Sequence, residues 1–426
     1  MMDSYSTLDP RSLKTEAEAQ QLRLDAFVER KLSLNMARGK PCREQLDLSS
    51  GMMTCLTESD VKALDGSDCR NYGLLEGLPE ARALFGSLLR VPAQQVIVAG
   101  NSSLNLMYDA VARALLTVIP GAARPWSKES TVKFLCPSPG YDRHFAVCRE
   151  LGIEMVVVDM TPEGPDMDQV ERLCAKDPTV KGIWCVPVYS NPDGITYSAE
   201  VCRRLAVMET APDFRIFWDN AYFLHHLYSD RQDAVPEMLG LCAEAGHPDR
   251  VYEFASTSKV TFAGGGVAAL ASSPANIEHI RRNMGIQTIG HDKINQLRHV
   301  RYLKDVEGVE RLMARHGDLL RPKFETVLRI LEAELGGLGI ASWNSPRGGY
   351  FISLFVEKGL AKRIIAMART AGVELTPAGA TYPYGQDPND WNIRIAPSFP
   401  PNSELSAAIE VLCVCVRLAS ARQRLA

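Results

Sequence analysis

The sequence lacks a long apolar run, an excess of charge of one sign and a cysteine pattern that binds metal. It contains no stretch of about 18 uninterrupted apolar residues, so we expect no transmembrane helix. The 47 lysines and arginines nearly balance the 51 aspartates and glutamates, so nothing predicts binding to nucleic acid or to a membrane surface. The eleven cysteines include no CxxC pair, and we expect no metal site.

What the chain does have is length and a balanced composition. With 426 residues, 46% of them hydrophobic and 23% charged, it is too apolar for intrinsic disorder and long enough for two or three domains. Its first 20 residues are polar and acidic, unlike a secretory signal. The closest cysteines, Cys413 and Cys415, lie in the apolar run 409–416, where they are expected to pack in a core. These features predict a cytoplasmic enzyme with free, buried thiols.

Short apolar segments alternate with helical segments between residues 94 and 271. Strands are expected at 94–99, 132–135, 154–158, 182–187, 215–218, 251–255 and 267–271, and helices at 104–117, 142–151, 166–175 and 198–210. Strands that are apolar on both faces and alternate with helices predict a mostly parallel sheet covered on both sides. Ligands bind beyond the carboxyl ends of such strands, where Asn101, Tyr141, Asn191 and Asp219 fall.

After residue 290 the pattern changes to longer helices and a small sheet. Helical segments run through 293–335, followed by a hairpin or sheet at 341–355, a helix at 358–371, a strand at 392–396 and a terminal helix at 403–419. We therefore predict three parts: an N-terminal arm that belongs partly to the small domain (1–60), a large domain (61–320) and a small α+β domain (321–426).

The strongest local motif is Ser256-Thr257-Ser258-Lys259, which three glycines follow at 264–266. A lysine between small hydroxyl residues is suited to bind a carbonyl cofactor beside a phosphate, once burial lowers the pKa of its amine. Taken alone, the motif is more typical of a solvated lysine in a loop.

Other polar residues give this lysine a chemical context. Asp219, at a strand end, can keep a pyridinium nitrogen protonated, Asn191 can donate to a phenolate oxygen, and Tyr141 can cover a flat ring. The helix start at Asn101-Ser102-Ser103 offers backbone N–H groups and hydroxyls for a phosphate, and Arg394 offers a planar fork for a carboxylate. Each residue alone also fits a structural role, as an N-cap, packing residue, turn residue or surface ion-pair member.

The order of these motifs resembles one known family. The motifs Asn191-Pro192-x-Gly194, Asp219-x-Ala221-Tyr222, Ser256-x-Ser258-Lys259 and Arg394-Ile395, with the stretch 71–82, are similar to the class I/II aminotransferases of fold type I, which use pyridoxal 5′-phosphate. The segments 38–41, 45–49, 138–144 and 295–299 resemble more closely a divergent bacterial branch of aspartate aminotransferases, sometimes called MocR-like aminotransferases. The resemblance covers nearly the whole chain.

The resemblance implies a three-layer α/β/α large domain, a smaller α+β domain and a homodimer with shared active sites. It implies that Lys259 binds the cofactor as an aldimine and moves protons, and that Asp219 pairs with the pyridine nitrogen. It further implies that Asn191 and Tyr222 bond the phenolic oxygen and that Tyr141 stacks on the ring. The remaining implied contacts are Asn101, Ser102, Ser103, Ser256 and Ser258 with the phosphate, Tyr72 with the phosphate of the neighbouring subunit, and Arg394, Gly39 and Asn191 with the substrate carboxylate.

One position departs from the family pattern. Val267 stands eight residues after Lys259, where many relatives have a phosphate-binding arginine, so another group must meet the phosphate charge. The substrates that the resemblance implies are aspartate and 2-oxoglutarate; alternatives are aromatic or aminoadipate-like amino acids, C–S β-lyase chemistry, and the effector-binding module of a MocR-type regulator. A dicarboxylic substrate also needs a cation for its distal carboxylate. The sequence does not decide which residue supplies it; the candidates are Arg38, Lys40, His291, Lys293 and Arg298.

Overall fold

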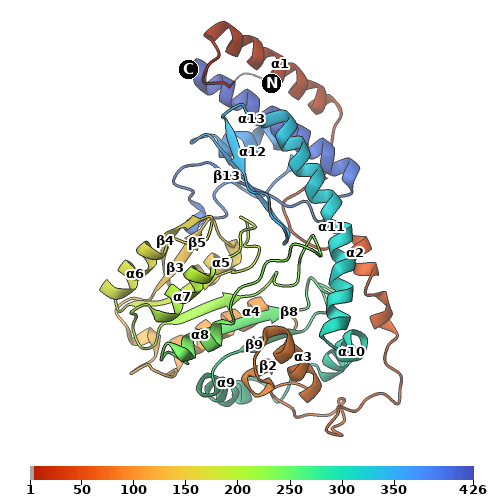
Figure 1. Cartoon of the computed structure of the whole chain (residues 1–426), viewed down its shortest axis with the longest axis vertical. Coiled ribbons are helices and arrows are strands. Elements are labelled where there is room, and N and C mark those ends of the chain that lie inside the picture. Colours follow the sequence, from red (N-terminus) through yellow and green to blue (C-terminus); the bar gives the residue numbers. More distant parts are fainter. Residues whose placement is uncertain (1–3) are drawn as a thin grey trace.

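The computed structural model describes residues 4–426, which fold around an eight-stranded sheet (Figure 1). Its strands are β2 (Val96–Val98), β3 (Lys133–Ser138), β4 (Glu154–Thr161), β5 (Gly164–Pro165), β6 (Val180–Cys185), β7 (Arg215–Asp219), β8 (Val251–Ser256) and β9 (Ala268–Ala271). Their spatial order is β2-β9-β8-β7-β6-β3-β4-β5. Only β9 and β5 pair antiparallel with their neighbours in this sheet of the described chain, which confirms the predicted mostly parallel sheet.

Helices cover both faces of this sheet and make three layers. The helices are α3 (Pro79–Leu89), α4 (Ser103–Leu116), α5 (Asp142–Glu150), α6 (Met167–Lys176), α7 (Ala199–Val207), α8 (Met238–Glu244) and α9 (Pro274–Gln287). Phe217 of β7 packs in a core with α4, α5 and α9, whereas its neighbours Ile216 and Trp218 pack in a second core with α3, α6, α7 and α8. Successive strand residues face opposite sides, so apolar residues at all three positions bury the strand from both faces.

A smaller α+β unit is built from both ends of the chain. It contains the antiparallel sheet β10 (Ala341–Trp343), β11 (Ile352–Val356) and β13 (Asn392–Ile395), the parallel pair β1 (Leu34–Asn35) and β12 (Val373–Glu374), and the helices α1 (Pro10–Glu29), α12 (Ala361–Thr370) and α13 (Asn402–Leu425). Helix α1 lies beside α13 at one end of the molecule (Figure 1), and Arg417 Nε donates to Glu16 Oε1 at 2.8 Å between them. Cys413 and Cys415 of α13 are fully buried, as expected from the apolar run.

Two helices connect the large sheet with the smaller unit. They are α10 (Lys293–Leu303) and α11 (Val306–Leu335), and α11 extends from beside α10 to α13 (Figure 1). The division of the chain at residues 60 and 320 stays a prediction, and α11 is continuous through the second position. The remaining helical elements are α2 (Arg43–Asp47) and 3₁₀ turns at Ser50–Met53, Ala93–Gln95, Trp126–Lys128 and Pro383–Gly385. Within residues 4–426, no helix combines the length and apolarity needed to cross a membrane.

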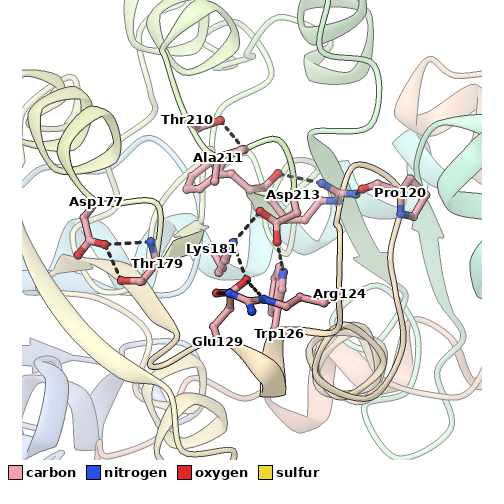
Figure 2. Close-up of polar contacts among 12 residues, drawn as sticks. Pro120, Arg124, Trp126, Glu129, Asp177, Thr179, Lys181, Thr210, Ala211 and Asp213 are labelled. Carbon is pink, nitrogen blue, oxygen red and sulfur yellow. Dashed lines mark hydrogen bonds and ion pairs between the residues drawn. The ribbon is translucent and has the colours of Figure 1, made fainter.

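Lys181 and Asp213 form a buried ion pair at the amino-terminal edge of the large sheet (Figure 2). Lys181 of β6 donates to Asp213 Oδ1 at 2.8 Å, and Asp213 Oδ2 accepts from Trp126 Nε1 at 3.0 Å. Glu129 lies 3.7 Å from the Lys181 amine and pairs with Arg124 at 2.8 Å. The buried Lys181–Asp213 pair is thus satisfied within the protein, at the edge opposite the carboxyl ends of the strands.

Candidate active site

A cavity of about 230 Å³ lies at the carboxyl edge of the large sheet. The residues that line it follow the ends of five strands, β2, β3, β6, β7 and β8, which all run in the same direction. The structure thereby brings together nine of the predicted site residues, namely Ser102, Ser103, Tyr141, Asn191, Asp219, Tyr222, Ser256, Ser258 and Lys259. Larger hollows of about 660 and 480 Å³ lie beside Gln232, and no predicted site residue lines them.

Asp219 lines this cavity, and only one of its two carboxylate oxygens is hydrogen-bonded. It ends β7 and is 2% exposed, with Oδ2 at 3.1 Å from His144 Nε2. Its Oδ1 has no hydrogen-bond partner among residues 4–426. The ring of His144 stacks on Trp184 with 4.4 Å between centroids, which fixes its orientation. A buried acceptor without a donor is costly, so this oxygen is suited to a donor that a ligand supplies.

The amine of Lys259 lies in the same cavity, 4.7 Å from the centroid of the Tyr222 ring. Burial lowers the pKa of this amine, and the negative charge of Asp219 acts in the opposite direction. A lysine attacks a carbonyl only as the neutral amine, so burial prepares Lys259 for covalent attachment.

Three buried histidines from different elements contact the backbone or side chains of the turn around Lys259. The contacts are His225 Nε2 with the Lys259 carbonyl at 3.4 Å, His316 Nε2 with the Val260 carbonyl at 3.0 Å, and His299 Nε2 with the Thr261 hydroxyl at 2.9 Å. Burial lowers the pKa of His299 and His316 to about 4 and that of His225 well below its usual range. We call these residues the histidine cage; at neutral pH they are uncharged and hold the turn by hydrogen bonds.

The N-terminal segment reaches the histidine cage through Gln45. Its Nε2 lies 3.0 Å from His316 Nδ1 and 2.9 Å from the Tyr350 hydroxyl, and its Oε1 accepts from the Cys42 N–H at 3.1 Å. Gln45 is fully buried, so these bonds are protected from water. The lysine turn is therefore tied to the N-terminal segment that precedes α3.

Backbone amides and hydroxyls gather on the other side of the cavity. Helix α4 begins there, and no side chain in the described chain caps its first amides at Ser102. Ser256 Oγ donates to Ser258 Oγ and Ser258 Oγ to the Asn101 carbonyl, both at 3.2 Å. Gly266 approaches Ser258 so closely that a Cβ there would lie 3.1 Å from the Ser258 nitrogen. We call this region, formed by the start of α4 at Ser102 together with Ser256 and Ser258, the anion corner. It suits an anion because amide and hydroxyl donors converge on it.

Val267 plays a structural part at the position where many relatives have arginine. It is 2% exposed, and its N–H donates to the Thr257 hydroxyl at 2.9 Å. Its side chain contributes no charge to the anion corner. The donors that the structure places at this corner are therefore neutral hydroxyls and amides.

Arg394 approaches the cavity from β13 of the smaller unit. Its Nη1 donates to Asp142 Oδ1 at 3.1 Å and to Asn191 Oδ1 at 3.2 Å, and its Nε donates to the Thr376 hydroxyl at 3.3 Å. The guanidinium lies 4.9 Å over the ring of Phe351. Gly39 also faces this ring, and a Cβ at Gly39 would collide with it. Arg394 and Gly39 thus lie next to the cavity, although neither lines it.

The structure leaves several predicted residues away from the cavity of their own chain. Tyr72 is 82% exposed, and Asn101 does not line the cavity, although its carbonyl accepts from the Ser258 hydroxyl. None of the five candidate cations lines the cavity. Arg38 is exposed, Lys40 lies over the Phe399 ring, His291 contacts the Met284 sulfur, Lys293 donates to the Gly73 carbonyl and Arg298 donates to Asn295.

Sequence reasoning assigned no role to His144, to the histidine cage or to Asp142. A local signal existed for His144, which lies three residues after Tyr141 and therefore on the same face of α5. His316 had no local signal, because its partner Gln45 is distant in the sequence and approaches it only in the folded chain.

Comparisons with known proteins agree with this geometry. The sequence model of a family described as aspartate amino-transferase matches residues 8–426. An aspartate aminotransferase of Corynebacterium glutamicum is 46% identical over 400 residues, covering 94% of this chain and 92% of the relative. A Mycolicibacterium smegmatis protein whose name gives it only as an aminotransferase is 50% identical over 420 residues, which are 98% of each chain.

Solved structures give the same result. The crystal structure of an aspartate transaminase from Corynebacterium glutamicum superposes with a TM-score of 0.96 and 45% identity, covering 99% of both chains. The α-aminoadipate aminotransferase LysN of Thermus thermophilus, solved with N-(5′-phosphopyridoxyl)-L-leucine, shares the fold at a TM-score of 0.72 and 21% identity, covering 96% and 97% of the two chains. The fold-type I architecture predicted from the motifs is confirmed. This chain belongs to the aspartate aminotransferase family and is an aminotransferase.

Proposed function

We propose that this enzyme transfers the amino group of aspartate to 2-oxoglutarate, with pyridoxal 5′-phosphate bound at Lys259. One observation carries the proposal: Lys259 lines the same cavity as buried Asp219, whose Oδ1 has no hydrogen-bond partner among residues 4–426. The name of the Corynebacterium glutamicum relative supports aspartate as the substrate.

The residues of the cavity fit this cofactor. When bound, pyridoxal phosphate supplies a carbonyl carbon for covalent attachment and an electron-accepting ring. Asp219 would accept a hydrogen bond from the ring nitrogen and hold the proton there, while His144 fixes the carboxylate from the other side. The neutral amine of Lys259 would remove the proton at the substrate Cα and deliver it to the former carbonyl carbon of the cofactor.

Other side chains of the cavity would orient the cofactor. Burial raises the pKa of Tyr222 well above its usual value, so its hydroxyl stays protonated and can donate, with Asn191, to the phenolic oxygen. Tyr141 would cover the ring. The phosphate would be held at the anion corner by Asn101, Ser102, Ser103, Ser256 and Ser258, and by Tyr72 of the partner subunit.

The substrate α-carboxylate would bind at Arg394 with help from Asn191 and the Gly39 backbone. Arg394 is 7% exposed and already bonded to Asn191, so it is held in position for a planar carboxylate. A guanidinium can bind such a group through two parallel N–H···O bonds, which fixes the orientation of the Cα proton.

A homodimer is part of the proposal. Large apolar side chains are exposed on the surface formed by Tyr72, Tyr108 and Leu116 of α4, Ile286 of α9 and Ile289. These segments adjoin one another, because Gln287 bonds Asp109 and Arg113 of α4 and Lys293 bonds Gly73. We call this surface the apolar face; a contiguous exposed patch of this kind favours association, and it would bring Tyr72 to a second subunit.

We also place the enzyme in the cytoplasm. All eleven cysteines are free in the described part of the chain, and ten of them are buried. Free thiols in such number are typical of a reducing compartment.

A half-reaction screen tests the proposed function. The purified holoenzyme is mixed with single amino acids, and the loss of the bound cofactor's absorbance is followed together with the 2-oxo acid that forms. Aspartate and glutamate should react rapidly, and phenylalanine, leucine and 2-aminoadipate slowly. Faster reaction with phenylalanine or aminoadipate would contradict the substrate assignment. Pyruvate and ammonia released from a sulfur amino acid without a 2-oxo acid acceptor would indicate β-lyase chemistry instead.

A further inference from the structure

The corner of Arg394 that faces Asn191 carries a carboxylate of the protein itself. Asp142 Oδ1 lies 3.1 Å from Arg394 Nη1, the same nitrogen that donates to Asn191. Asp142 is the first residue of α5 and directly follows Tyr141, which lines the cavity. The substrate-binding guanidinium is thus already paired with a negative charge at the edge of the site.

The two partners of this ion pair differ in their freedom to move. The Arg394 side chain is 7% exposed and is held from three other directions by Thr376, Asn191 and the ring of Phe351. The Asp142 side chain is 35% exposed and has no hydrogen-bond partner other than Arg394 among residues 4–426. Asp142 can therefore rotate into water, whereas Arg394 stays in place.

Binding a substrate carboxylate to Arg394 while Asp142 stays in place would cost free energy. Two carboxylates on one buried guanidinium would leave an uncompensated negative charge, which is expensive in a site of low dielectric constant. Replacing one carboxylate by another keeps the charge of the corner unchanged.

We propose that the carboxylate of Asp142 competes with the substrate α-carboxylate for Arg394, leaves when the substrate binds, and thereby lowers the affinity of the site for its substrates. This inference rests on the proposed function, in which Arg394 is the α-carboxylate site. Every carboxylate ligand must overcome the Asp142 contact, so its measured affinity is lower than its intrinsic affinity for Arg394. Because this cost is the same for every carboxylate that binds at Arg394, it lowers affinity without changing the preference between ligands.

The Asp142→Asn variant tests the proposal on the holoenzyme. Its amide oxygen can still accept from Arg394 Nη1, so the arginine keeps a partner while the competing charge is removed. The dissociation constants of maleate and of acetate are measured by titration calorimetry at fixed ionic strength. We expect both to fall about fivefold, the size of an ion pair of about 1 kcal/mol. Unchanged or weaker binding would overturn the proposal, because Asp142 would then only position Arg394.

Two further variants separate local competition from other effects. Glu150→Gln removes the same charge from the far end of α5, where Glu150 is exposed, and should leave both dissociation constants unchanged. If Glu150→Gln tightens binding as much as Asp142→Asn does, net charge explains the effect and the proposal is wrong. Steady-state kinetics should show a lower KM for aspartate in Asp142→Asn without a higher kcat; a change in kcat alone would contradict the proposal.

The Arg394→Gln variant distinguishes the inference from the function on which it rests. Maleate binding should weaken strongly in this variant, and adding Asp142→Asn should then bring no gain. If Arg394→Gln binds maleate like the wild type, the α-carboxylate assignment fails. If Arg394→Gln weakens binding but Asp142→Asn brings no gain in the wild-type background, only the competition is refuted. Near-ultraviolet circular dichroism confirms that each variant is folded.

Discussion

At the scale of single residues, the most informative atom is Oδ1 of Asp219. Other buried carboxylates of the described chain also have an oxygen without a donor, but Asp219 lines the cavity and its other oxygen is bonded to an oriented histidine. This arrangement fits a carboxylate that holds a proton on a ligand nitrogen rather than one that stabilises the fold.

The Asp219→Asn variant should slow Cα proton removal by about a hundredfold to a thousandfold, as when one preorganised electrostatic contact to developing charge is lost. Single-turnover mixing of the loaded variant with aspartate measures this step, and the melting temperature provides the control for folding. A rate within tenfold of the wild type would remove Asp219 from the mechanism.

Lys259 leads to a second prediction at this scale, on the pH dependence of its amine. Burial lowers the pKa from the usual 10.5, and the charge of Asp219 opposes that shift, so Asp219→Asn should lower the pKa of Lys259 further. In the apoprotein, the rate at which acetic anhydride labels Lys259, read by mass spectrometry across pH, should have its midpoint below 10.5 and lower still in the variant. A midpoint that rises in the variant would contradict the account.

At the scale of elements, the histidine cage joins α10, α11 and the loop after β7 to the lysine turn. The pKa of His316 is about 4 in the folded chain and near the usual 6.5 when unfolded, so between these values only the unfolded state takes up a proton. The free energy of unfolding contributed by His316 is fully present above about pH 6.5 and falls by about 1.4 kcal/mol per pH unit down to about pH 4.

Replacing His316 by glutamine should therefore flatten the acid side of the stability curve. Glutamine can still donate to the Val260 carbonyl, so the unfolding free energy at pH 8 should change little. Urea unfolding at a fixed protein concentration, at pH 8, 6.5 and 5, measures the difference. Equal slopes for wild type and variant would show that His316 is not a neutral, buried histidine.

The charged pairs at the amino edge of the sheet give a prediction about stability alone. Asp213→Asn removes the nearer counter-ion of the buried Lys181 amine and leaves only Glu129, 3.7 Å away, so it should cost about 2 kcal/mol of unfolding free energy. The pair of Lys133 with Asp177 is 25% and 30% exposed, so Lys133→Met should cost less than about 1 kcal/mol. Neither change should alter the dissociation constant of maleate, because this edge lies opposite the cavity. Equal costs for the two variants, or weaker maleate binding, would contradict this division of roles.

At the scale of the whole molecule, the apolar face should be required both for dimer formation and for activity. Ile286 and Ile289 are 87% and 62% exposed, and replacing both by aspartate should produce a monomer with little activity, because Tyr72 then reaches no partner site. Light scattering after size exclusion measures the mass. Leu22→Asp on α1 changes an equally exposed leucine outside this face and should stay dimeric. A dimer that survives the double change would refute the proposed interface.

Much of the architecture could be predicted from local sequence, because strand ends are marked by chemistry that recurs along the chain. Asp219 ends the apolar strand β7 and Asn191 lies six residues after β6, and parallel strands bring such ends to one edge. The contacts of Gln45 with His316 and of Asp142 with Arg394 could not be predicted, since each joins distant segments through side-chain geometry alone. The helical segments expected through 293–335 include α11, but a helical pattern does not reveal which unit each turn packs against, so the boundary at residue 320 stays a prediction.

The central claim is that the amine at Lys259 carries the cofactor, and borohydride reduction tests it most directly. Reduction of the holoenzyme fixes any covalent link, and peptide mapping by mass spectrometry then identifies the labelled lysine. The account predicts one phosphopyridoxyl group per chain on the peptide that contains Lys259, and none in Lys259→Ala. A label on a different lysine, or a wild-type protein that takes up no label after incubation with pyridoxal phosphate, would contradict it.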